Sequence, residues 1–357
     1  MNIQPFKIAV RDDDLDDLHS RLESTRFTDE IPGSGSEYGV SLEWVKRMTD
    51  YWCSGYDWRT WETRLNAYPQ FTTEIDGQKI HFLHIRSGRR KALPLILTHG
   101  WPGTVMEYLD VIDDLSKDFH LVIPSLPGSG FSGPTRERGW NRYRIARAWA
   151  ELMKRLGYKR YGAAGNDAGS NISPELGRID PERVTGVHVT QIFSFPSGDP
   201  AEMEGLTMEE QSALQHLQWF WENKGAFNTL QSQSPQTLAH ALADSPTGLL
   251  AWMGQLIAVD DEFTLTNIMI HWLCRTAGSS MRLYYEDAKA EHPSGPSSVP
   301  IGLAGFANDF KSIRRFAERD HRNIVQWNTY DVGGHYAAHE VPDVYTADLR
   351  GFFEKFR

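Results

Sequence analysis

The chain has 357 residues, of which 40% are hydrophobic, 24% charged and 12% aromatic, as in an ordinary water-soluble globular protein. Its formal net charge of −10 argues against a surface for nucleic acid or for an anionic membrane, either of which would need a basic face. The two cysteines, Cys53 and Cys274, are too few for a disulfide framework or a structural zinc site, which favours a reducing compartment.

The first ninety residues are predicted to form helices followed by a β-hairpin. The predicted helices cover residues 10–22, 41–52 and 58–68. Their apolar residues recur at helical spacing, and Ser41 is placed to cap the second helix. Residues 72–75 and 79–85 are predicted strands that flank Asp76-Gly77, a dipeptide typical of two-residue hairpin turns.

Strands and helices then alternate along the chain. The run from Leu93 to Thr98 is continuously apolar, as expected for a strand covered on both faces of a sheet. Further strands are predicted at 120–123, 161–164, 184–193, 300–306 and 325–330. Helices are predicted at 107–115, 143–156, 170–179, 312–319 and 342–356. This alternation predicts an α/β fold with a mostly parallel sheet and helices on both of its faces.

A helical insertion interrupts the alternation after Pro196. No convincing strand occurs in the next hundred residues. Thr207 and Glu210 form a capping box for one helix, and Ser245-Pro246 starts another. Residues 291–300, EHPSGPSSVP, are the most loop-like in the chain and end the insertion.

The sharpest local motif is Gly165-Asn166-Asp167-Ala168-Gly169, which lies between a predicted strand and a predicted helix. Small residues on both sides of a central polar residue are typical of a nucleophile elbow, a tight turn that lifts one side chain above the sheet. The glycines permit a strained backbone and a close approach of neighbouring chain. The alternative is an ordinary turn in which the Asp167 side chain caps the helix.

A second motif, His99-Gly100-Trp101-Pro102-Gly103, follows the first parallel strand. An α/β-hydrolase places half of its oxyanion hole at this position. We therefore expect the backbone N–H groups of Trp101 and Ala168 to converge on one developing oxyanion.

Two further residues complete a candidate triad. His335 follows the last predicted strand in Gly333-Gly334-His335, and Asp309 follows the strand before it. Asp167, Asp309 and His335 then stand in the nucleophile–acid–histidine order of α/β-hydrolases. The alternative for His335 is a surface histidine, since the chain has 13 histidines.

A carboxylate nucleophile narrows the reaction class. It is poorly suited to attack on an ester but well suited to displacement at a saturated carbon, which gives an alkyl-enzyme ester. His335, held by Asp309, would activate water to attack the carbonyl carbon of that ester. The leaving group would be a halide or an epoxide oxygen, and the latter needs a proton donor such as tyrosine.

Seven segments spread along nearly the whole chain carry a family resemblance. They are YDWRTWETRLNAYPQFTTEIDG, LTHGWPG, IPSLPGSGFSG, GNDAGS, ALADSPTGLLAW, SSMRLYYE and VGGHYAAHEVP. With these segments the chain resembles the microsomal-type epoxide hydrolases, in the branch with a meander ahead of the α/β-hydrolase core. The resemblance implies Asp167 as nucleophile, His335 as water-activating base and Asp309 as its acid partner.

The resemblance also implies an organisation and a ligand. We expect a meander over 1–90, an α/β-hydrolase core over 91–195 and 298–357, and a helical lid over 196–297. The expected partner is a small-molecule epoxide, hydrophobic or aromatic, with no metal or cofactor and neither nucleic acid nor membrane; a homodimer is left open. Mammalian members of the family carry a membrane anchor, whereas this chain starts at the meander and lacks a run of about 18 apolar residues. We therefore expect a cytoplasmic enzyme.

Two positions beside the triad depart from the family. Ala168 stands where the family has tryptophan, which keeps the backbone N–H but reshapes or enlarges the pocket floor. Asp309 stands where the family usually has glutamate, which shortens the reach by one methylene. Asp287 and Asp320 remain alternatives for the acid.

The largest departure concerns the lid tyrosines that donate protons in the family. Tyr284 in SSMRLYYE matches one donor, and Tyr285 is a poorer match. Alignment on LQSQSPQT places Phe227 at the other, and phenylalanine has no proton to donate. We therefore expect Tyr284 to protonate the epoxide oxygen, helped by water or by the substrate itself.

Aromatic residues of the lid fit a core and a pocket lining equally well. They are Trp219, Phe220, Trp221, Trp252 and Trp272. Since a lid covers a cavity, we expect one or two of them to touch substrate. The predicted pocket consists of Trp101, Phe227, Trp219 and Trp252.

Three other functions remain open from the residues. Phe227 and Ala168 fit a tailoring enzyme of secondary metabolism that acts on a bulky natural product, with Asp167 as base in a cyclisation or elimination. A haloalkane dehalogenase would use the same nucleophile, although the lid has no obvious pair of halide-holding Trp N–H donors. A binding protein on a decayed hydrolase scaffold would not require an intact triad.

Overall fold

The computed structural model describes residues 3–257, 259–291 and 295–356, and it is built around one nine-stranded sheet. The strands are β1 (Gln4–Phe6), β2 (Gln70–Ile75), β3 (Gln78–Ile85), β4 (Leu93–Thr98), β5 (Phe119–Pro124), β6 (Tyr161–Gly165), β7 (Val184–Val189), β8 (Ile301–Gly305) and β9 (Ile324–Thr329). Their order is β1-β2-β3-β5-β4-β6-β7-β8-β9. The pairs β1–β2, β2–β3 and β3–β5 are antiparallel. The pairs β5–β4, β4–β6, β6–β7, β7–β8 and β8–β9 are parallel.

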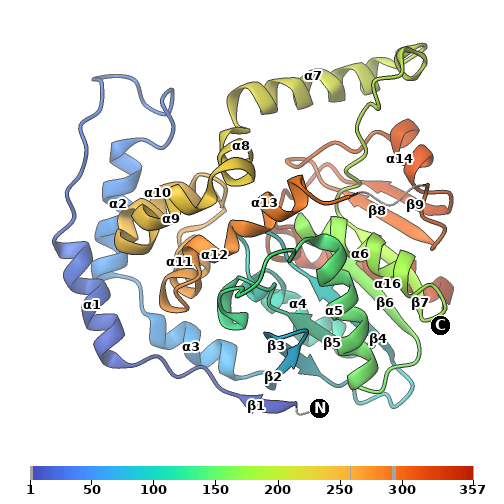
Figure 1. Cartoon of the computed structure of the whole chain (residues 1–357), viewed down its shortest axis with the longest axis horizontal. Helices are drawn as coiled ribbons and strands as arrows, with labels where there is room; N and C mark the ends of the chain where they lie inside the picture. Colours follow the sequence, from blue (N-terminus) through green and yellow to red (C-terminus); the bar gives the residue numbers. More distant parts are fainter. Residues whose placement is uncertain (1–2, 258, 292–294, 357) are drawn as a thin grey trace.

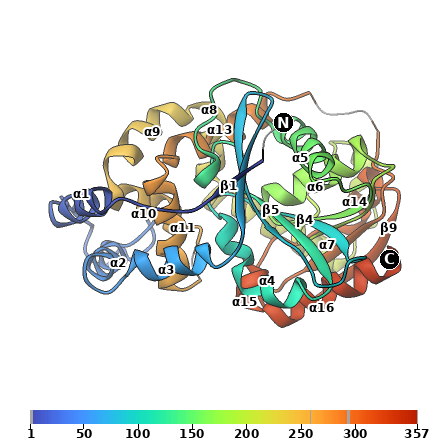
Figure 2. The same cartoon turned by 90° about the horizontal axis from the view of Figure 1, so that it is seen from below.

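Helices cover both faces of the sheet, as predicted (Figure 2). Outside the insertion they are α1 (Asp12–Glu23), α2 (Leu42–Ser54), α3 (Trp58–Asn66), α4 (Leu109–Leu115), α5 (Arg142–Arg155), α6 (Ala168–Ile179), α14 (Arg314–Asp320), α15 (Ala337–Glu340) and α16 (Pro342–Phe353). Short 3-10 helices are η1 (Val105–Tyr108), η2 (Gly130–Ser132), η3 (Pro200–Met203) and η4 (Glu354–Phe356). One apolar core joins the sheet to α5 and α6, and another joins it to α4 and α16. The strand β4 lies between them, and its residues 94–98 are buried.

The hairpin and the parallel pairing of strands β4 to β9 confirm the main sequence predictions. Asp76 and Gly77 have φ values of 52° and 71°, the positive pair that a tight β-turn between two strands requires. Two strand predictions differ from the structure. The strand predicted to reach Phe193 ends at Val189, because Thr190 and Gln191 turn their side chains to polar partners. The strand β1 was not predicted, since its three residues show no alternation and pair only with β2.

The insertion between β7 and β8 is helical, as predicted. Its helices are α7 (Met208–Asn223), α8 (Ala226–Gln233), α9 (Pro235–Asp244), α10 (Pro246–Gly254), α11 (Asp261–Leu273), α12 (Ala277–Ser280) and α13 (Arg282–Ala288). The predicted capping box of Thr207 and Glu210 is present at the start of α7. Figure 1 shows α7 running away from the other inserted helices, and none of its residues is buried. Of the predicted loop 291–300, residues 292–294 lie outside the described residues.

The N-terminal helices pack against the inserted helices (Figure 1). The first turn of α11 is the main polar junction, because each of its acidic residues contacts a different partner. Arg47 of α2 donates to Asp261 over 2.6 Å, and Trp61 of α3 donates its indole N–H to Glu262 over 2.6 Å. The Tyr51 hydroxyl also donates to Glu262.

A histidine also connects the N-terminal end of α11 to the sheet domain. His339 of α15 contacts Asp110 of α4 through Nδ1 at 2.5 Å and Asp260, the N-cap of α11, through Nε2 at 2.7 Å. Its ring stacks on Phe263 with 4.2 Å between centroids. Burial opposes a charge on His339, but the two carboxylates outweigh it and raise its pKa above the ordinary value.

This contact predicts a pH-dependent stability. Because the folded pKa of His339 is raised, its charge stabilises the fold fully below the unfolded pKa of about 6.5, and that stabilisation is lost as pH rises through the folded pKa. We expect His339→Gln to lower the free energy of unfolding by about 1–3 kcal/mol near pH 6 and by less at pH 9. Urea unfolding at both pH values measures the two differences. Equal differences at both values would contradict the prediction.

Candidate active site

The turn between β6 and α6 holds Asp167 in a strained conformation. Its φ of 52° and ψ of −117° are unfavourable for any residue with a side chain. A Cβ on Gly165 would lie 2.2 Å from the backbone of Gly169, and one on Gly169 would lie 1.9 Å from the Thr98 carbonyl oxygen. The Asp167 side chain makes no capping hydrogen bond to α6. The turn therefore has the geometry of a nucleophile elbow, and the simple helix-cap alternative is wrong.

The loop after β4 reaches the same carboxylate. The backbone N–H of Trp101 donates to Asp167 Oδ1 over 2.9 Å. A Cβ on Gly100 would lie 2.2 Å from that oxygen, so only glycine permits this approach. Ala168 is the first residue of α6, where backbone N–H groups have no partner within the helix. Both predicted oxyanion donors therefore adjoin Asp167.

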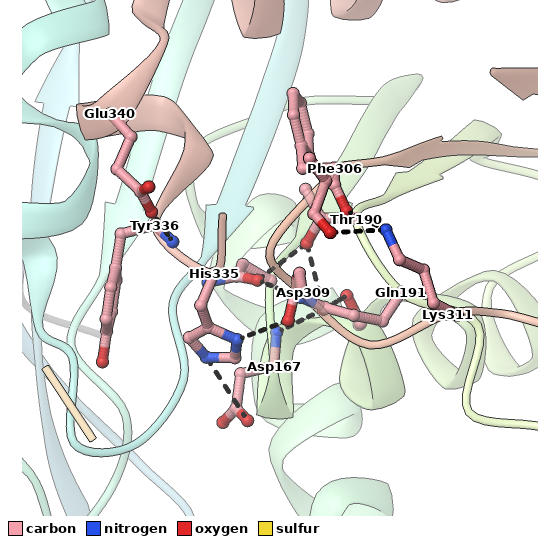
Figure 3. A network of polar contacts seen from close by, with 12 residues as sticks. Asp167, Thr190, Gln191, Phe306, Asp309, Lys311, His335, Tyr336 and Glu340 are labelled. Atoms are coloured by element: carbon pink, nitrogen blue, oxygen red, sulfur yellow. Dashed lines mark hydrogen bonds and ion pairs between the residues drawn. The ribbon is translucent and has the colours of Figure 1, made fainter. Parts of the chain in front are cut away.

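The three predicted triad residues come together (Figure 3). His335 Nδ1 lies 2.9 Å from Asp309 Oδ1, and His335 Nε2 lies 3.8 Å from Asp167 Oδ2. The two alternative acids are engaged elsewhere, Asp287 by Arg142 and Asp320 by Arg319. Asp309 is therefore the carboxylate that contacts the histidine.

The charges at the site are strongly coupled. Burial opposes a charge on Asp309, but His335 and the Gln191 amide outweigh it and lower its pKa. Burial also opposes a charge on His335, yet Asp309 and Asp167 raise its pKa to about 10. Both neighbours therefore favour the protonated form of the His335 ring, and part of this effect comes from Asp167.

The residue that joins this network, Gln191, was missed by the sequence analysis. Its Oε1 accepts from the Asp167 backbone N–H over 2.9 Å, and its amide nitrogen donates to Asn166 Oδ1 over 2.7 Å and also to Asp309. It lies just beyond β7, at the end of the sheet where the triad meets (Figure 3). A buried polar residue at the carboxyl end of a parallel strand is the signal that identifies it.

Aromatic side chains from the insertion face the oxyanion loop. The Trp101 indole stacks on Phe227 with 6.0 Å between centroids and meets the edge of Tyr284 at 5.6 Å. Phe227 and Tyr284 contact each other at 5.9 Å. Burial and the Asp167 charge raise the pKa of Tyr284 well above its ordinary value, so its hydroxyl stays protonated.

The structure brings only some of the predicted pocket residues to this cluster. Trp219 is 48% exposed on α7 and stacks on His216, so its placement in the pocket was wrong. Trp252 donates its indole N–H to Gln231 and packs against the core of the inserted helices. Phe220, by contrast, contacts Phe227 at 6.5 Å.

Comparison with known proteins identifies the fold and the family. A family model described as "Epoxide hydrolase N terminus" matches residues 3–108, and one described as "alpha/beta hydrolase fold" matches residues 94–252. The chain is thus an α/β-hydrolase.

Individual relatives show to which family of α/β-hydrolases the chain belongs. The chain is 39% identical, over 99% of its length and 86% of the relative, to a Stigmatella aurantiaca (strain DW4/3-1) protein with the provisional name epoxide hydrolase. It is 31% identical to juvenile hormone epoxide hydrolase 2 of Ctenocephalides felis, over 99% of this chain and 86% of that one. The solved structure of Aspergillus niger epoxide hydrolase matches with a TM-score of 0.89 and 30% identity, over 100% of this chain and 97% of that chain. The chain therefore belongs to the epoxide hydrolase family and is a hydrolase enzyme, which confirms the resemblance.

Proposed function

We propose that this enzyme opens an epoxide to a vicinal diol through a covalent ester on Asp167, without a cofactor. One observation carries the proposal: the two Asp167 oxygens have different partners. Oδ1 accepts from the Trp101 N–H, whereas Oδ2 lies 3.8 Å from His335, which in turn contacts Asp309 at 2.9 Å. Oδ2 is then the attacking oxygen, and Oδ1 becomes the ester carbonyl in the oxyanion hole.

Ring opening is the first step. Asp167 Oδ2 attacks an epoxide carbon, the ring C–O bond breaks, and Tyr284 gives its proton to the departing oxygen. Tyr284 is the donor by position, since its ring packs on Trp101, whose backbone holds the nucleophile. Phe227 occupies the neighbouring place and has no proton to give.

Ester hydrolysis is the second step. Water attacks Cγ of Asp167 and loses a proton to His335, and the Trp101 and Ala168 N–H groups receive the charge on Oδ1. The Cγ–O bond to the substrate breaks, the diol oxygen takes the proton from His335, and Asp167 returns its acid proton to the Tyr284 phenolate.

The charge of Asp167 determines at which step His335 can act as a base. An ester on Asp167 has no negative charge, so one of the carboxylates that raise the pKa of His335 is lost. The imidazolium then gives up its proton to solvent water more readily and becomes a competent base, and it takes a proton back from solvent when the Asp167 carboxylate is restored. Asp309 retains its charge throughout and keeps the ring oriented through Nδ1.

Isotope labelling tests the covalent mechanism. With enzyme in excess over styrene oxide in ¹⁸O-water, the first diol is expected to be unlabelled, because its new oxygen comes from Asp167. Repeated turnovers then deliver label. Label in the first diol would show direct attack by water and overturn the proposal.

A tyrosine substitution tests the proton donor. We expect Tyr284→Phe to slow ester formation by about 10²–10⁴-fold, the range typical of a lost general acid. Tyr285→Phe is the matched control, because Tyr285 lies under the Lys289 ammonium at 4.6 Å and should retain the wild-type rate. Rapid-quench single turnovers measure both. A normal rate in Tyr284→Phe would assign the proton to another donor.

A tailoring reaction remains the second candidate, and Phe227 is the observation that favours it. Phenylalanine beside Tyr284 leaves one tyrosine hydroxyl in the cluster formed by Trp101, Phe227 and Tyr284. A cyclisation or elimination with Asp167 as base would form no ester. The same labelling experiment separates the two, since such a product takes no oxygen from Asp167.

The substrate class, assembly and location are also proposals. The stacked Trp101 and Phe227 rings support a hydrophobic or aromatic epoxide. Exposed Met208, Trp219 and Trp221 on α7 support a homodimer, which light scattering would detect. The free thiols of Cys53 and Cys274 support a cytoplasmic location. In the described parts of the chain, no helix combines the length and apolarity needed to span a bilayer.

A further inference from the structure

A buried carboxylate lies directly behind the oxyanion loop. Glu107 belongs to η1, is 1% exposed, and its Oε2 makes no hydrogen bond with the residues that the structure describes. Burial raises the pKa of Glu107 to about 8, and the nearby His335 charge limits the rise. A buried polar group without a partner is costly, so its presence here requires an explanation.

Two residues next to the triad also have a buried polar atom without a hydrogen-bond partner among the described residues. These atoms are the Tyr336 hydroxyl oxygen and the Asn166 side-chain nitrogen. Asn166 precedes the nucleophile, and the Tyr336 ring meets the edge of the His335 ring at 5.0 Å, on the side away from Asp309 (Figure 3).

The three groups converge behind the site. A Cβ on Gly103 would lie 3.3 Å from both Glu107 Oε2 and Tyr336 Cε1, so both side chains lie against this glycine of the oxyanion loop. The Asn166 amide is close enough to lower the pKa of Glu107 against the effect of burial. An acceptor, an amide donor and a hydroxyl together match the two to four partners that a buried water molecule needs.

We infer that Glu107, Tyr336 and Asn166 hold the water molecule that hydrolyses the Asp167 ester. Glu107 is then a positioning residue: Oε2 accepts one hydrogen of the water, and the other points to His335 Nε2. The water oxygen bonds to Cγ of Asp167 while its second proton passes to His335, and the bond from Cγ to the substrate oxygen breaks. A neutral Glu107 places no repulsive charge beside the developing oxyanion. The inference rests on the proposed ester mechanism.

The test separates the two chemical steps in Glu107→Leu. In single turnovers with styrene oxide, we expect ester formation at the wild-type rate and ester hydrolysis slowed by about 10- to 100-fold, as for a displaced reactant. Glu107→Gln retains the shape and a carbonyl acceptor, so it should recover most of the hydrolysis rate. Leucine replaces an unpaired buried polar group, so the thermal midpoint should not fall.

A remote buried carboxylate serves as the matched control. Asp348 accepts from His188, Gln326, Asn328 and Tyr330 at 2.6–2.8 Å. Asp348→Asn should lower the thermal midpoint and leave both rate constants unchanged.

Wild-type ester hydrolysis in Glu107→Leu would overturn the inference. If the thermal midpoint also fell, the role of Glu107 would be purely structural. Absence of any ester in the wild-type enzyme is a separate outcome, because it would remove the proposed function itself.

Discussion

Replacing Asp167 with alanine is expected to lower epoxide turnover by at least about 10⁴-fold, the scale seen when a nucleophile is removed. Among the described residues no other carboxylate contacts the Trp101 N–H, so none is expected to take the place of Asp167. Asp167→Asn should also be inactive at first, since a neutral amide is a poor nucleophile. Diol formation from a panel of epoxides measures the loss.

Asp320→Ala is the matched control for this prediction. Asp320 pairs with Arg319 at the end of α14 and was an alternative acid by sequence, so it should keep the wild-type rate. Substantial diol formation by Asp167→Ala would contradict the role of Asp167.

His335→Gln is expected to open epoxides but to retain the product as an ester. The attacking oxygen Oδ2 remains in place, whereas the imidazole that lies 3.8 Å from it is removed. We expect hydrolysis to slow by about 10²–10⁴-fold, as for a lost general base. Peptide mass spectrometry should find the peptide containing Asp167 heavier by the mass of the substrate.

Tyr284→Phe provides the opposite pattern for comparison, because it slows formation of the ester rather than its loss. A His335→Gln protein that consumes epoxide without carrying the adduct would exclude the covalent intermediate.

Most of the fold follows from local patterns. The apolar strand β4 and the capped helices α2 and α7 were predicted within a few residues, because burial on both faces and capping leave clear local signals. The edge strand β1 was not, since its three residues acquire their conformation only by pairing with β2.

The candidate active site likewise contains some residues that the sequence predicts and some that it does not. Asp167, Asp309 and His335 follow strands and stand in motifs with recognisable spacing, so their juxtaposition could be predicted. Gln191 and Glu107 carry no such motif, and their importance appears only when the sheet brings their neighbours together. Trp219 shows the converse error: aromatic character predicted a pocket, but α7 places the ring in solvent.

The junction at the start of α11 limits how this enzyme can be recombined with its relatives. Arg47, Trp61 and His339 come from three separate parts of the chain, and all three bind the acidic first turn of that helix or its cap. A chimera that exchanges the inserted helices alone would separate these partners from their carboxylates. Exchanges that move α2, α3 and the insertion as one unit keep two of the three contacts, so they are the better route to altered substrate range.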